Sequence, residues 1–97
     1  MALWSLFVEV GSKLRYSTQI PAPTPRAAIR RLLSPRGLIS HDLARLSKSG
    51  WPKAFSMRDV LSLVPMEGLI NMYVCQIERN GKHISVILAR TVARHAG

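Results

Sequence analysis

The chain of 97 residues has a single cysteine, Cys75, and only five acidic residues. One cysteine cannot form an intramolecular disulfide, so the fold must depend on packing and a reducing compartment is expected. No uncharged apolar run approaches the roughly 18–20 residues of a membrane span. The best candidate, residues 68–77, contains Asn71 and Gln76. We therefore expect neither a disulfide framework nor contact with a membrane.

Targeting information at the N-terminus is sparse. The first eight residues have no basic region and Glu9 follows early, which is atypical of a secretory signal. Residues 1–40 contain five Arg, one Lys and one acid, as mitochondrial transit peptides do, but the first twenty residues have the pattern of strands rather than of an amphipathic helix. We expect a cytoplasmic protein, with the mitochondrial matrix as the alternative.

Residue patterns that support catalysis are also missing. Residues 40–42 read Ser-His-Asp, but adjacent side chains at a helix start point in different directions and do not form a triad. The six glycines form no phosphate-binding loop, and the five acids offer no carboxylate pair. The candidate metal ligands have no ligand spacing: His41, Cys75, His83 and His95. We expect a non-enzymatic protein without a metal or cofactor.

Positive charge is what the chain has in excess. Lys and Arg number 14, the formal net charge is +9, and Arg outnumbers Lys ten to four. Arginine suits bidentate contacts with phosphate or carboxylate better than lysine does. The hydrophobic share of 47% is enough for a core, and the length suits a single domain over residues 1–97. Composition thus favours a small, folded, basic binding module.

The N-terminal segment is predicted to form a hairpin. Residues 3–10 are apolar on both faces, whereas residues 13–20 alternate apolar and polar side chains. Between them, Gly11 and Ser12 suit a two-residue type II′ turn. We expect the first strand to be the more buried one and the second to lie nearer an edge.

The middle of the chain is predicted to contain two to three helices. Thr24 is a candidate N-cap with Pro25 at the first helical position, followed by an apolar stripe. A second helix is expected over residues 40–50. A third is expected over residues 56–64, where Asp59 stands in the capping-box position relative to the first residue.

The C-terminal segment is predicted to form a second hairpin, because residues 70–79 and 82–90 flank Asn80-Gly81, a strong turn signal. Counting outward gives the register Arg79/Lys82, Glu78/His83, Ile77/Ile84, Cys75/Val86 and Tyr73/Leu88. One face of this hairpin is wholly apolar. The other is polar near the tip and apolar toward the base, at Val74/Ile87 and Met72/Ala89.

The order of elements from residue 24 to 90 resembles the winged helix-turn-helix DNA-binding domains. The matching stretches are residues 28–33, 38–46 and 56–64, with 67–70 leading into a wing turned at 79–82. The resemblance implies DNA binding, a recognition helix at 56–64 and a wing at 70–90. Two features depart from it, because the implied recognition helix exposes Arg58, Asp59 and Ser62 and the 50–55 connection is long.

Two architectures remain open for an α+β fold. In the first, both hairpins join in one antiparallel four-stranded sheet with the helices on one face, which explains a first strand that is apolar on both sides. The second is a winged helix-turn-helix with an extra N-terminal hairpin.

The leading functional hypothesis is contact with nucleic acid or a nucleoprotein complex. Arg-rich helices and a basic hairpin tip would meet phosphates, and such binding weakens with salt. The residues expected to do so are Arg26, Arg30, Arg31, Arg36, Arg45, Lys48, Arg79 and Lys82. Most of the charge lies in residues 24–53 (seven basic, one acidic) and 79–97 (four basic, none acidic).

The alternative is a small phage- or plasmid-type inhibitor or accessory protein that binds a host protein complex. Its contacts would come from the strand edge at residues 13–20 and from the aromatic residues Trp4, Tyr16 and Trp51. A homodimer is compatible with either hypothesis.

Overall fold

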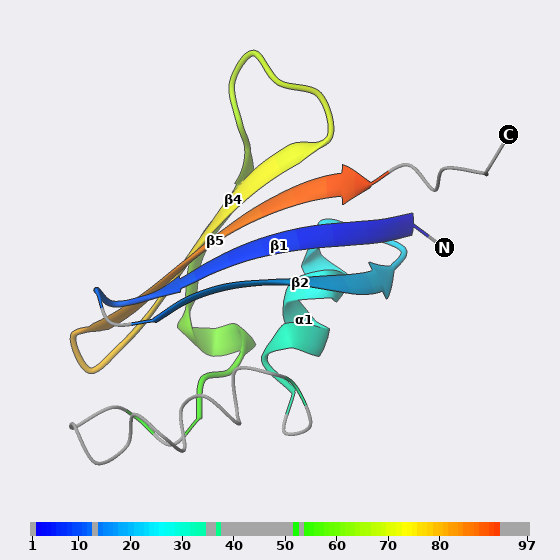
Figure 1. Ribbon diagram of the computed structural model, residues 1–97. Coiled ribbons are helices and arrows are strands. Elements are labelled where there is room, and N and C mark those ends of the chain that lie inside the picture. The colour runs from blue at the N-terminus through cyan, green and yellow to red at the C-terminus, as the bar shows by residue number, and fades with distance from the viewer. Residues whose placement is uncertain (1, 13, 35–36, 38–51, 53, 92–97) are drawn as a thin grey trace, which may run out of the picture.

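The computed structural model describes residues 2–12, 14–34, 37, 52 and 54–91, which form one five-stranded antiparallel sheet (Figure 1). The strands are β1 (Ala2–Val10), β2 (Leu14–Ala22), β3 (Val60–Pro65), β4 (Met72–Arg79) and β5 (Lys82–Thr91). Their order across the sheet is β2-β1-β5-β4-β3, so the two hairpins join through β1 and β5. The helix α1 (Pro25–Leu32) and the 3-10 turn η2 (Met57–Asp59) lie on one side of the sheet.

The predicted fold class was wrong. Five strands and a single α-helix are present in the described residues, instead of four strands with two to three helices. The helix predicted over 56–64 is only the turn η2 followed by strand β3. The same segment was the recognition helix of the winged helix-turn-helix alternative, so that architecture fails here as well. The helix predicted over 40–50 lies outside the described residues.

The reason for the error at 56–64 is visible in the local geometry. Ser56 and Asp59 do form a capping box, with the Ser56 amide donating to Asp59 Oδ2 over 2.7 Å. A capping box specifies how a helical turn begins but not how long the helix continues. From Val60 onward the chain is rich in strand-forming residues and pairs with the free edge of β4, which satisfies its backbone hydrogen bonds.

The turn of the N-terminal hairpin also differs from the prediction. Val10 pairs with Leu14, so three residues separate β1 from β2 instead of two. A two-residue loop would have shifted the register by one position and turned Arg15 toward the core. The observed register places Leu14 and Tyr16 on the same face as Val8 and Val10. The three-residue loop therefore keeps these apolar side chains on the side of the core.

The C-terminal hairpin has the predicted register throughout, from Arg79/Lys82 at the tip to Tyr73/Leu88 near the base. Asn80 and Gly81 both have positive φ angles, 53° and 77°. Two such residues in succession are what a two-residue type I′ turn requires.

The core lies between the sheet and the helical elements. One face of β1 supplies Trp4, Leu6, Val8 and Val10, and α1 supplies Ala28, Ile29 and Leu32. The rest of the buried set is Ala22, Leu33, Phe55, Cys75, Ile77, Ile84, Val86 and Leu88. We call this side of the sheet the helix side.

The opposite side of the sheet, which we call the open face, is not covered by any helix or strand of the described residues (Figure 1). Alternation along the paired strands assigns side chains to it. It comprises Leu3, Ser5, Phe7, Glu9, Arg15, Ser17, Gln19, Pro21, Ser62, Val64, Met72, Val74, Gln76, Glu78, His83, Ser85, Ile87, Ala89 and Thr91.

Candidate nucleic-acid interface

Helix α1 begins as the sequence predicts. The Oγ1 atom of Thr24 accepts a hydrogen bond from the Ala27 amide over 3.0 Å, and Pro25 occupies the first turn, where its missing N–H costs nothing. Ala28, Ile29 and Leu32 then face the core. Because these apolar residues recur at helical spacing, the arginines between them must face away from the sheet.

Three arginines therefore lie on the exposed surface of α1, at positions 26, 30 and 31. The guanidinium of Arg31 donates to the carbonyl oxygen of Pro21, which ties the last turn of the helix to the end of β2. Arg26 and Arg30 are i, i+4 neighbours, and neither makes an ion pair within the described part of the chain. The helix contains no acidic residue.

The tip of the C-terminal hairpin adds charge to the same side. Arg79 and Lys82 are paired in the register and share the face of Ile77 and Ile84, which is the helix side. The Nη1 atom of Arg79 donates to the carbonyl oxygen of Ala54 over 2.6 Å. Arg79 thus holds the segment that enters η2, in addition to presenting charge near the tip.

The acidic residues mostly lie elsewhere. Glu9 pairs with Arg15 over 3.6 Å on the open face, and Glu78 lies 3.7 Å from His83, also on the open face. Asp59 is occupied with the cap of η2. The described basic residues of the helix side are Arg26, Arg30, Arg31, Arg58, Arg79, Lys82 and Arg90. The helix side therefore carries the excess positive charge, whereas the open face is close to neutral.

The aromatic surface predicted for a protein partner is not formed by Trp4. Its side chain is 4% exposed and belongs to the core, so this prediction was wrong. Successive side chains of β1 lie on opposite faces of the sheet, and the pairing with β2 and β5 places Trp4 on the helix side. Tyr16 is half-buried against the core from β2. Trp51 lies outside the described residues.

Several other predicted residues also fall outside the described part of the chain: Arg36, Arg45, Lys48 and the Ser40-His41-Asp42 stretch.

Groups that could carry catalysis are scarce in the described residues. No cluster of three His, Cys, Asp or Glu side chains that could hold a metal ion occurs among them. Burial raises the pKa of the Cys75 thiol to about 11, which leaves it protonated and weakly nucleophilic near neutral pH. No described helix is long and apolar enough to cross a membrane.

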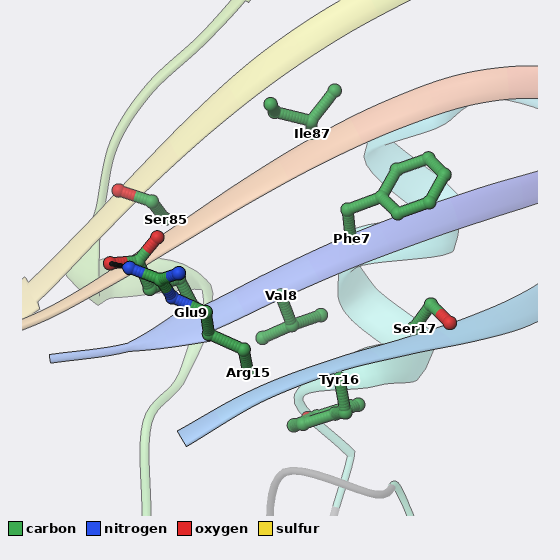
Figure 2. A pocket seen from close by; sticks show the side chains of 8 residues that line it. All are labelled: Phe7, Val8, Glu9, Arg15, Tyr16, Ser17, Ser85 and Ile87. Atoms are coloured by element: carbon green, nitrogen blue, oxygen red, sulfur yellow. Dashed lines mark ion pairs between the residues drawn. The ribbon is translucent and has the colours of Figure 1, made fainter. Parts of the chain in front are cut away.

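A second surface was not singled out from the sequence. A shallow pocket is lined by Phe7, Val8, Glu9, Arg15, Tyr16, Ser17, Ser85 and Ile87, all of which belong to the open face except Val8 and Tyr16 (Figure 2). Phe7 and Ile87 stand beside each other on the open face, and Arg15 reaches over to Glu9 (Figure 2). The apolar pairs Val74/Ile87 and Met72/Ala89 were the sequence signal for this surface.

Comparisons with protein-family models, curated proteins and solved structures find no match for this chain.

Proposed function

We propose that this protein is a non-enzymatic binding module that contacts the phosphates of nucleic acid, free or within a nucleoprotein complex, through its helix side. The observation that carries the proposal is the pair Arg26 and Arg30. Both are exposed, lie one turn apart on α1 and have no acidic neighbour on the helix. Solubility alone does not explain this segregation, because charges that only solubilise a protein are normally interspersed with charges of the opposite sign.

The chemistry of these contacts predicts binding without base recognition. Guanidinium groups fit phosphate oxygens in bidentate fashion, and phosphate contacts set position but carry no sequence information. Helix α1 contains no Asn, Gln, Asp or Glu, the side chains that read adenine and cytosine edges, and we assign its arginines to phosphates. We therefore expect similar affinity for unrelated sequences and a steep loss of affinity with salt.

The test is the salt dependence of binding to a labelled duplex and a labelled single strand, measured by fluorescence anisotropy. Arg30→Ala should lower the slope of log K against log salt by about 1, and Arg26→Ala/Arg30→Ala by about 2. The matched control is Arg15→Ala, which removes the same charge from the open face. It should leave the slope within error of the unmodified protein.

Two results would overturn the proposal. One is the lack of any anisotropy change with either probe at low salt. The other is an equal loss for Arg15→Ala and Arg30→Ala, because general charge would then be enough to explain the binding.

The alternative of a host-complex inhibitor has less support. Its predicted aromatic surface loses Trp4 to the core, although β2 does form an edge of the sheet. Purification after nuclease treatment separates the two functions. A stoichiometric protein that remains bound, with affinity unaffected by Arg26→Glu/Arg30→Glu, would favour the inhibitor.

A further inference from the structure

Four apolar side chains form one straight row across the open face. The register pairs Phe7 of β1 with Ile87 of β5, Ile87 with Val74 of β4, and Val74 with Val64 of β3. Residues paired in register stand side by side on the same face of a sheet. The row thus crosses four of the five strands.

The row is accessible as well as apolar. Phe7 is 52% exposed, Val64 46% and Ile87 37%. An antiparallel sheet that faces water on one side normally carries polar side chains there. The neighbouring row does so, with Arg15, Glu9, Ser85, Gln76 and Ser62 in register. An apolar row bordered by polar residues is the pattern of an interaction surface.

The charge of the open face limits what can cover the row. Its charged side chains are Arg15, Glu9 and Glu78, together with the titratable His83, and the two glutamates each face a partner on the same surface. Such a face does not attract phosphates, so it is a poor surface for nucleic acid. Its occupant should be apolar at the centre and nearly neutral.

We propose that the open face packs against the open face of a second copy of the chain. The open face of a second copy is itself apolar at the centre and nearly neutral, so it meets both requirements. The chain carries a net charge of +9, so two copies repel each other in most orientations. Contact between the open faces brings together the surfaces without excess charge and leaves both helix sides pointing outward, where the charges are farthest apart.

The geometry and the size of the surface suit this arrangement. Two sheets of equal twist pack face to face at about 10 Å, with side chains of the inner faces interdigitating. A twofold axis along the row sets each of its four side chains against the same residue of the second copy. Five strands about 4.8 Å apart and four rows of side chains about 6.8 Å apart give an open face of roughly 600 Å² per copy. The total of about 1,200 Å² is at the lower bound for a specific interface.

The proposal concerns assembly and does not depend on the proposed function, because the dimer is measured without nucleic acid. The mass of the full-length chain is determined by sedimentation equilibrium from low micromolar to near-millimolar concentration. We expect a monomer–dimer equilibrium. Ile87→Lys should weaken it by about 100-fold or more, because the twofold axis brings two like charges together in the interface.

The matched control is Ile70→Lys. This residue is 87% exposed in the β3–β4 loop and does not belong to the row. It receives the same substitution and should leave the dissociation constant unchanged. Far-UV circular dichroism checks that both variants remain folded.

A photo-reactive phenylalanine analogue at position 7 gives an independent measurement in a chain with an otherwise unchanged sheet. We expect a covalent dimer. An excess of unlabelled Ile87→Lys chain should not reduce its yield, because this variant is expected to bind the native chain poorly. A monomeric native chain at all concentrations would overturn the proposal. Equal weakening by Ile70→Lys, or cross-linking only to a different protein from the host, would overturn it as well.

Discussion

The indole Nε1 of Trp4 donates a hydrogen bond to the carbonyl oxygen of Ala22 over 3.0 Å, at the far end of β2. The same ring meets Tyr73 of β4 edge-on, with 5.7 Å between ring centroids and 65° between the planes. One side chain therefore connects three strands under the sheet. Its polar N–H is satisfied although the residue is almost fully buried, which removes the main cost of placing tryptophan in a core.

This position predicts a large loss of stability for Trp4→Ala. Truncating a buried aromatic side chain costs about 3–5 kcal/mol in unfolding free energy. Phe7→Ala removes an aromatic side chain from the same strand but from the open face, and at low protein concentration should cost less than about 1.5 kcal/mol. Urea denaturation followed by circular dichroism gives both values. Equal costs would contradict the assignment of the two faces.

The N-cap of α1 gives a second stability prediction. Thr24→Ala removes the acceptor for the Ala27 amide and should cost about 1 kcal/mol. Thr24→Ser keeps a hydroxyl in the same place and should recover most of that loss. Urea midpoints at constant m-value measure the difference. A serine variant as unstable as the alanine variant would show that the methyl group matters and the cap does not.

The buried thiol of Cys75 makes stability depend on alkaline pH. Its pKa is about 11 in the folded chain and 9.0 as the ordinary value. Between these values the unfolded chain loses the thiol proton while the folded chain keeps it. The free energy of unfolding that the buried, protonated thiol contributes is therefore fully present below about pH 9. It is lost as pH rises toward 11, with a slope of up to about 1.4 kcal/mol per pH unit.

The control for this prediction is Cys75→Ala, which cannot titrate at this position. Lysine and tyrosine also titrate in the alkaline range, so only the difference between the two unfolding curves reports the thiol. That difference should narrow as pH rises. The thiol should also react with a thiol reagent at pH 8 only after unfolding, and fast reaction of the folded chain would contradict its burial.

Salt should act with opposite sign on the two proposed interactions. Phosphate contacts at Arg26 and Arg30 release counterions, so affinity for nucleic acid falls as salt rises. Contact between open faces opposes the repulsion of two chains of +9, which salt screens, so dimerisation should strengthen. Anisotropy and sedimentation over one salt series measure both trends. Two trends of the same sign would contradict one of the assignments.

Local signals predicted the parts of the fold that local chemistry controls. Asn80-Gly81 specified the C-terminal hairpin and its register, and Thr24-Pro25 specified where α1 begins. The segment at 56–64 was misread because a capping box describes a single turn. The segment forms β3 because it pairs with the free edge of β4. This pairing is a tertiary contact, which the sequence of the segment alone does not show.

The candidate surfaces show the same division. The arginines of α1 were predictable because helical spacing separates apolar from charged positions. For Trp4 and Phe7, alternation along the strand showed that they lie on opposite faces of the sheet, but not which of the two faces the helix covers. Trp4 was placed on the surface for that reason, and the row beginning at Phe7 was overlooked.

The pairing of β1 with β5 has a consequence for the order of folding. Leu3 contacts Thr91 and Val10 contacts Ile84, so the middle of the sheet closes loops of more than seventy residues. Each hairpin can form from local contacts. Closing such a long loop, in contrast, costs conformational entropy before the hydrogen bonds between β1 and β5 can form. During synthesis the second edge of β1 therefore has no partner until β5 has been made.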